Sequence, residues 1–246
     1  MTDLHNGRNA AYAVGYLLLA LLGAGLLATT SDRDVGLLGG LLLLVVAAGG
    51  LVLVGHDAWF VRHRPGVSVA TAPSGVRATA FVRSGVPTVM SAVMPALLAA
   101  WAVVGCVVAD APAARVILAL VALGFASPLV AVARGRVVPG GLYLTPAGVE
   151  QRKEAVSWSI SWDELAGAVP SEPLALTLAG PPPQPVVRTR WLWQREPTAP
   201  AGVVAVDSRY LAEDPVVVVG VVARCIVDPA LRQRMGSDEV VAEIRR

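Results

Sequence analysis

Four long stretches of the chain consist of apolar, small and uncharged polar residues, without any Asp, Glu, Lys or Arg. They cover residues 9–31, 35–56, 84–109 and 116–133, and are 23, 22, 26 and 18 residues long. A bilayer core about 30 Å thick is crossed by about 20 apolar helical residues that rise 1.5 Å each. The pattern therefore predicts four transmembrane helices, at about residues 10–30, 36–55, 87–109 and 114–133.

From about residue 137 onward the pattern changes to that of strands. In residues 156–163, Val-Ser-Trp-Ser-Ile-Ser-Trp-Asp, apolar and polar side chains alternate with the period of a half-buried strand. Further strands are predicted at residues 142–145, 174–178, 186–193 and 203–206. We therefore expect an α-helical membrane domain over residues 1–136, followed by a small α+β domain over residues 137–246.

The end of the chain carries helix start signals. Asp214 and Asp228 each precede a proline, which combines an N-cap with the residue best suited to the first helical position. A helix from Pro215 would present an apolar face to a sheet, although the valine run at residues 216–219 also fits a strand. Ser237 begins a last short helix.

Charge is distributed unevenly between the two halves. Residues 1–133 hold 12 charged side chains and residues 134–246 hold 26, so the second half has the polarity of a globular domain. The net charge is only +2, without a dense basic region, so we expect no nucleic-acid partner. Nineteen arginines against the single Lys153, with abundant Ala, Val and Gly, indicate a bacterial genome of high GC content.

The arginines also indicate orientation. The N-terminus, the connection between the second and third spans, and the segment after the fourth span are rich in Arg, whereas the other two connections carry acids. Basic segments stay on the cytoplasmic side during insertion. The sequence therefore predicts a multi-pass protein of the bacterial inner membrane with both termini, and the second domain, in the cytoplasm.

The four charge-free stretches offer no Asp, Glu, Lys or Arg at membrane depth, which disfavours a pump or an ion-coupled carrier. Pro95 and Pro128 interrupt the third and fourth spans at similar depth, a feature of some transporter sites that helix packing also explains. Gly36-xxx-Gly40 in the second span fits close helix packing within the chain. The same pattern leaves a homo-oligomer open.

The connection after the second span suits the membrane interface. Trp59 and Phe60 are residues favoured at headgroup depth, and Arg62 and Arg64 would meet lipid phosphates. These four residues are the predicted membrane contacts. His56 and His63 have no third ligand of matching type nearby, so we expect no metal site.

Residues for catalysis are missing from the second domain. All three histidines lie in the first 63 residues, which excludes a Ser-His or Cys-His nucleophile system within that domain. Cys106 lies in a span and Cys225 in the soluble half, so we expect no disulfide between them. We predict neither enzymatic activity nor a cofactor.

One pair of basic residues is a candidate interaction surface. Arg188 and Arg190 alternate along a predicted strand and so lie on one face of it. A solvated strand face is the alternative interpretation.

The segments GLYLTPAGVEQR (141–152), SISWDELAGAV (159–169) and DPALRQRMG (228–236) resemble bacterial PH-like domains attached to membrane helices in uncharacterised actinobacterial proteins. The resemblance implies a small, bent antiparallel barrel closed by a C-terminal helix, which acts in binding or assembly. We therefore expect a non-catalytic integral membrane protein whose cytoplasmic PH-like domain binds a protein partner. A small transporter, or the membrane subunit of one, is the alternative.

Overall fold

The computed structural model describes residues 2–29, 33–187 and 200–246. The chain forms two compact units. The helical unit comprises Met1–Arg62 and Val86–Gly135, and the sheet unit comprises His63–Gly85 and Arg136–Arg246. This division differs from the predicted boundary at residue 136, because residues 63–85 belong to the sheet unit.

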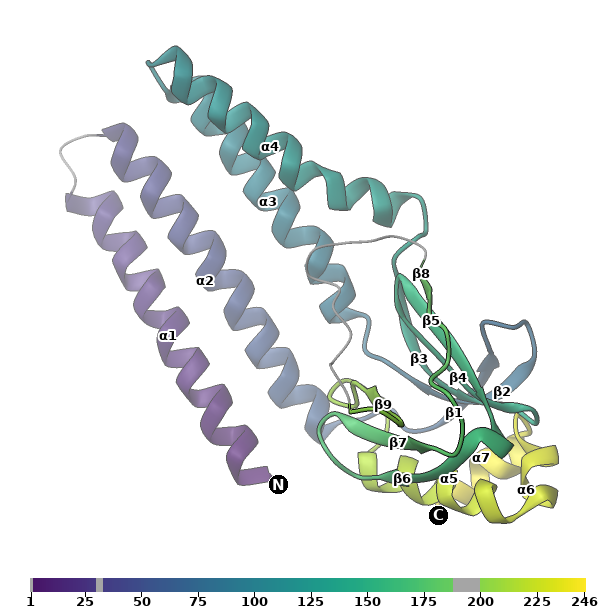
Figure 1. Cartoon of the computed structure of the whole chain (residues 1–246). Coiled ribbons are helices and arrows are strands. Elements are labelled where there is room, and N and C mark those ends of the chain that lie inside the picture. The colour runs from purple at the N-terminus through teal and green to yellow at the C-terminus, as the bar shows by residue number, and fades with distance from the viewer. Residues whose placement is uncertain (1, 30–32, 188–199) are drawn as a thin grey trace. The chain divides into compact units, whose positions relative to one another are not determined.

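The helical unit consists of four long helices, α1 (Thr2–Thr29), α2 (Arg33–Arg62), α3 (Val86–Val108) and α4 (Pro112–Ala133). Within the unit, α1 packs against α2, α2 against α3, and α3 against α4 (Figure 1). All four are long and apolar enough to cross a membrane, with mean hydropathies of 2.0 to 2.7. At most 22% of the residues in each apolar window are buried, as expected of helices whose sides face lipid. The prediction of four apolar helices is confirmed.

Close packing of α1 against α2 depends on two glycines. A Cβ atom on Gly40 would lie 2.7 Å from the carbonyl oxygen of Gly23, and a Cβ atom on Gly23 would lie 2.9 Å from that of Gly40. The two backbones therefore approach too closely for any other residue. This contact uses Gly40 for packing within the chain. In α3 and α4, the helix continues through Pro95 and Pro128, which are both buried.

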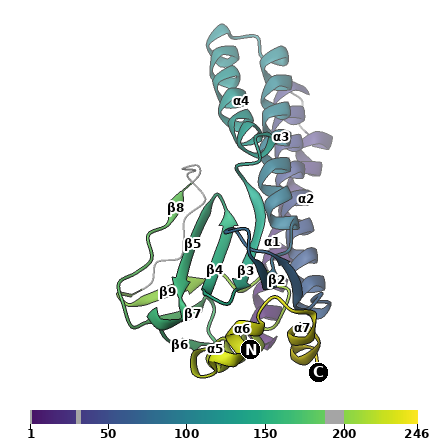
Figure 2. The same cartoon turned by 90° about the vertical axis from the view of Figure 1, so that its right-hand side faces the viewer.

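The sheet unit contains two antiparallel sheets (Figure 2). The larger has the strand order β1 (Ser68–Thr71), β2 (Arg77–Val82), β3 (Val138–Leu144), β4 (Gly148–Glu154), β5 (Val156–Ser161) and β8 (Val186–Val187). The smaller has the order β6 (Leu165–Val169), β7 (Leu174–Leu178) and β9 (Val203–Val206). A single 3-10 turn, η1 (Trp162–Glu164), connects β5 to β6 and so leads the chain from one sheet to the other.

The predicted strand at residues 156–163 is confirmed as β5, which ends at Ser161. Its apolar residues Val156, Trp158 and Ile160 are buried, while the serines between them are more exposed. Strands β3, β7 and β9 also match predictions. Strands β1, β2, β4 and β6 were not predicted. Of the predicted strand at 186–193, residues 186–187 form β8 and the remainder lies outside the described residues.

Three helices end the chain: α5 (Pro215–Val227), α6 (Pro229–Arg234) and α7 (Asp238–Ile244). The predicted N-caps are confirmed. The Asp214 carboxylate accepts a hydrogen bond from Val216 N–H, and the Asp228 and Ser237 side chains cap the next two helices. Residues 216–219 are therefore helical.

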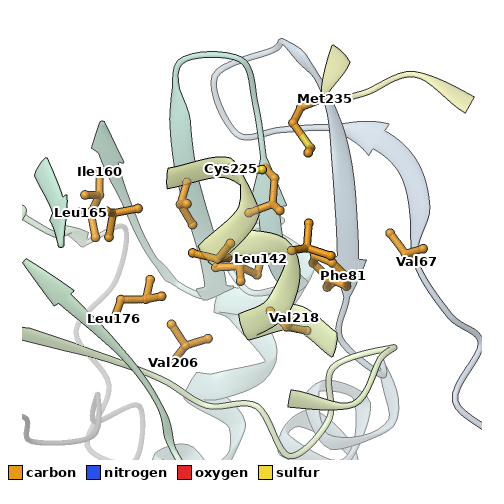
Figure 3. Close-up of a cluster of buried hydrophobic side chains, with 14 of the residues drawn as sticks. Val67, Phe81, Leu142, Ile160, Leu165, Leu176, Val206, Val218, Cys225 and Met235 are labelled. Carbon is orange, nitrogen blue, oxygen red and sulfur yellow. The ribbon is translucent and has the colours of Figure 1, made fainter. Parts of the chain in front are cut away.

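The core of the sheet unit lies between the two sheets and α5 (Figure 3). Val218 and Cys225 on the buried face of α5 join Phe81 and Leu142 of the larger sheet and Leu176 of the smaller one in this cluster. Burial raises the pKa of the Cys225 thiol to about 12. Cys225 is therefore a protonated, apolar part of the core at neutral pH.

Candidate functional site

The hairpin β1–β2 brings the connection between α2 and α3 into the same sheet as the chain that follows α4. Strand β2 pairs with β3, so that Phe81 lies opposite Leu142 and Val82 opposite Gly141. The segment between β9 and α5 also hydrogen-bonds to the end of β2. Its Ala212 N–H donates a hydrogen bond to the Val82 carbonyl oxygen at 2.9 Å. Residues far apart in the sequence therefore meet at the end of β2.

A row of paired residues crosses four strands on the core face of the larger sheet: Phe81, Leu142, Gln151 and Trp158. Arg83 comes two residues after Phe81, and Lys153 two residues after Gln151. Because side chains alternate between the faces of a strand, both cations lie on the core face, beside this row. The amide of Arg83 donates to the Gly140 carbonyl oxygen at 2.8 Å, which continues the pairing of β2 with β3.

Asp207 bridges the two cations. Its Oδ2 atom lies 2.8 Å from Arg83 Nη2 and 3.2 Å from Lys153 Nζ. Strand β3 lies between the strands that lead to Arg83 and Lys153, so the backbones of these two residues are about 10 Å apart across the sheet. The Asp207 carboxylate thus links cations that come from non-adjacent parts of the sheet.

Electrostatics keep Asp207 charged. Burial of Asp207 alone raises its pKa, but the attraction of Arg83 and then of Lys153 outweighs that effect, so the pKa lies below its ordinary value. The three side chains together carry a net charge of about +1 at neutral pH. Such an excess of charge at a largely buried position is costly unless something compensates it.

The same strands, and the residue after Asp207, hold buried polar atoms that find no hydrogen-bond partner among the described residues. They are Arg83 Nε, Gln151 Oε1, Trp158 Nε1 and Ser208 Oγ. The four residues are between 1% and 7% exposed. Buried polar groups in proteins are normally satisfied by protein, water or ligand. We call Arg83, Gln151, Lys153, Trp158, Asp207 and Ser208 the buried polar cluster.

An aromatic ring adjoins the buried polar cluster. The Tyr210 ring centre is 6.0 Å from the Arg83 guanidinium carbon and 5.4 Å from that of Arg209. Both distances fit cation–π contacts. Arg83 therefore contacts both an aromatic ring and a carboxylate, while its Nε has no hydrogen-bond partner among the residues described.

The predicted membrane contacts have different environments. Trp59 and Arg62, at the end of α2, are exposed, whereas Phe60 is 5% exposed and its ring centre lies 5.5 Å from that of His56. Arg64 is partly buried. Its guanidinium donates hydrogen bonds to two backbone carbonyl oxygens, those of Leu211 and Glu213, so it stabilises the sheet unit.

The predicted interaction surface, Arg188 and Arg190, lies outside the described residues. No group of three or more His, Cys, Asp or Glu side chains in the described part of the chain is arranged to hold a metal ion.

The helical unit contains a buried carboxylate that the predicted span limits left out. Helix α2 continues to Arg62 and includes Asp57, which is 1% exposed. Asn9 Nδ2 of α1 donates to Asp57 Oδ2 at 2.5 Å. The predicted absence of Asp, Glu, Lys and Arg holds for the charge-free stretches, whereas helices α2 and α4 extend beyond them and include Asp57 and Arg115. The interaction joins the first helix to the second.

Comparisons of the chain with protein-family models, with curated proteins and with solved structures gave no match.

The buried polar cluster was not predicted from the sequence. The available signals were the single lysine and the Gly140-Gly141 pair, which marks a close approach of strands.

Proposed function

We propose that the chain is a bacterial inner-membrane protein whose four helices anchor the sheet unit, a PH-like domain, at the cytoplasmic face, where it binds a protein partner. The observation that carries the anchoring part is the pairing of β2 with β3. These strands come before α3 and after α4, so a membrane-spanning α3–α4 hairpin returns the chain to the side that it left. The excess of Arg in the same segments favours the cytoplasmic side.

The PH-like identity is supported by the arrangement of the sheet unit. It has two antiparallel sheets that share one core, and the chain enters the second sheet at η1, within the SWDEL segment. Helix α5 contributes four of its residues to that core and packs against β6. A core of this kind, shared by two sheets and a helix, suits a binding domain. Binding to a protein partner is favoured over catalysis because residues 136–246, which form most of the unit, contain no histidine.

Cysteine labelling tests the topology. We expect Val76→Cys and Gln233→Cys to react with a membrane-impermeant maleimide only in permeabilised cells, and Ala111→Cys, between α3 and α4, to react in intact cells. Cys106 is replaced by Ser for this purpose, while Cys225 is buried, with its pKa raised to about 12, and stays unlabelled. Labelling of positions 76 and 233 from opposite sides would contradict a single sheet unit. Labelling of both from outside would reverse the proposed orientation.

Site-specific photo-crosslinking tests partner binding in intact membranes. A photoreactive residue at Val227, which is 79% exposed at the end of α5, should give a discrete protein adduct that mass spectrometry identifies reproducibly. The matched control places the same residue at Ala111, which is exposed but belongs to the helical unit. Equal adducts from both positions, or none from several exposed positions of the sheet unit, would count against a partner-binding domain.

A further inference from the structure

We propose that the buried polar cluster is a binding site for a phosphate group that retains a proton. The proposal concerns the interior of the sheet unit and does not depend on the partner proposed above. It rests on three observations: the excess positive charge of Arg83, Lys153 and Asp207, the buried polar atoms without a described partner, and the chemistry of those atoms.

The net positive charge of the cluster favours an anion as its ligand. Arg83 and Lys153 supply two positive charges, and Asp207 supplies one negative charge. A bound cation would be repelled by both basic groups, whereas an anion would complete the balance. Water would satisfy hydrogen bonds without supplying the missing charge.

The donors and the acceptor among the unpartnered atoms indicate which anion would fit. Arg83 Nε and Trp158 Nε1 carry hydrogen and act only as donors, and the Ser208 hydroxyl can donate. Gln151 Oε1 is an acceptor and requires a donor. A monoprotonated phosphate has oxygens to accept from the donors and one hydroxyl to donate to Gln151. Sulfate, of the same shape, has no proton to donate at neutral pH.

The strand register places these groups together. Gln151 and Trp158 are directly paired on β4 and β5, and Lys153 is the next residue of β4 on the same face. Asp207 forms ion pairs with both Lys153 and Arg83, and Ser208 is the next residue of the chain. The side chains of Lys153 and Asp207 are 17% and 27% exposed, against 6% for Arg83, so the cluster meets solvent on the side of Lys153 and Asp207. A small ion would enter there.

The test measures binding to the full chain in nanodiscs of zwitterionic lipid. Inorganic phosphate is titrated at constant ionic strength, with sulfate and chloride as references, and the melting temperature and the binding midpoint are recorded. We expect phosphate to raise the melting temperature by several degrees more than sulfate or chloride does. Nanodiscs containing phosphatidic acid, a phosphate monoester, form a second arm, which shows whether a lipid headgroup is the source of the phosphate.

Two tryptophans provide a matched pair of variants. Trp158→Phe removes an indole N–H that has no described partner, and should weaken phosphate binding about tenfold or more with little loss of stability. Trp162→Phe removes an indole N–H that donates to the Thr145 carbonyl oxygen at 2.9 Å. It should lower the melting temperature and leave phosphate affinity unchanged. Ser208→Ala, which loses no described hydrogen bond, should weaken phosphate binding as Trp158→Phe does.

The outcomes separate the alternatives. Phosphate stabilisation that Trp158→Phe and Ser208→Ala reduce, and Trp162→Phe does not, supports the site, whether the phosphate is free or on a lipid. Equal stabilisation by phosphate, sulfate and chloride would overturn it and indicate that water alone fills the cluster. Stabilisation by phosphate that none of the variants changes would also overturn it, by placing the ion elsewhere.

Discussion

Gly140→Ala is expected to destabilise the sheet unit by about 3 kcal/mol or more. The Cβ atom would lie 1.6 Å from the backbone carbonyl oxygen of Arg152 on β4, and no rotation of a side chain relieves an overlap between backbone atoms. Gly140 lies within the irregular stretch of β3 between Val138 and Gly141, where the pairing register with β4 shifts. Strand β3 must therefore separate from β4 or lose its register shift. Protease resistance of residues 136–246 during thermal unfolding of the full chain measures the effect.

The same substitution elsewhere in the unit provides the control. Gly220 lies on the exposed side of α5, where an added Cβ atom meets nothing within 4 Å. Because alanine favours a helix more than glycine does, Gly220→Ala should stabilise the unit by about 0.5 to 1 kcal/mol. Equal effects of the two variants would mean that the close approach at Gly140 does not exist. A Gly140→Ala variant that retains full protease resistance would lead to the same conclusion.

The four apolar helices were predictable because continuous apolar length, which a bilayer requires of a spanning helix, is displayed directly by a linear sequence. The ends of these helices were less predictable. Helix α2 continues seven residues past the predicted end at residue 55, as far as Arg62. Asp57 is accommodated in that extension because Asn9 of α1 hydrogen-bonds to it. That partner lies 48 residues away in the chain, so the local pattern contained no sign of it.

The missed strands have physical reasons. Strand β4, Gly-Val-Glu-Gln-Arg-Lys-Glu, has few apolar residues, and its place in the sheet comes from its neighbours β3 and β5 rather than from its own hydrophobicity. Strands β1 and β2 are short and lie in a connection whose aromatic and basic residues suggested the membrane interface. Four successive residues of β2, Ala78 to Phe81, are buried, so this strand lacks the alternation of apolar and polar residues that predicts a half-buried strand.

The buried polar cluster was beyond sequence reasoning for a topological reason. The hydrogen bond from Arg83 to Asp207 joins residues 124 positions apart, with the apolar helices α3 and α4 between them in the chain. Only the return of the chain to the same sheet brings them together. Non-local contacts of this kind follow from the fold and leave no local pattern.

The segments that suggested a PH-like domain have structural tasks in this chain. In the SWDEL segment, Ser161 and Glu164 form a capping box around η1, and Trp162 hydrogen-bonds to the turn between β3 and β4. In the DPALRQRMG segment, Gly236 has a φ angle of +85°, and an added Cβ atom would lie 2.5 Å from the Arg77 carbonyl oxygen. Residues of this kind specify the fold, so the resemblance concerns architecture more than a ligand.

Arg232 in the same segment is expected to be the most important single cation for the stability of the sheet unit. Its Nε and Nη2 atoms donate to the carbonyl oxygens of Cys225 and Ile226, at 2.5 and 2.6 Å. These carbonyls belong to the last turn of α5, where no further helical residue can satisfy them, and a positive charge there also interacts favourably with the negative end of the helix dipole. The guanidinium carbon lies 5.9 Å from the centre of the Trp162 ring.

Arg232→Met keeps an apolar stem against Trp162 and removes every hydrogen bond, so we expect a loss of about 2 to 4 kcal/mol in the free energy of unfolding. Arg77→Met is the control. It removes a cation whose partner Asp238 is 82% exposed, and such surface pairs contribute less than about 1 kcal/mol. Asp163→Asn should also have little effect, because Asp163 is 89% exposed and only one of the contacts of Arg232 depends on it. If Asp163→Asn were as harmful as Arg232→Met, the ion pair rather than the end of α5 would explain the role of Arg232.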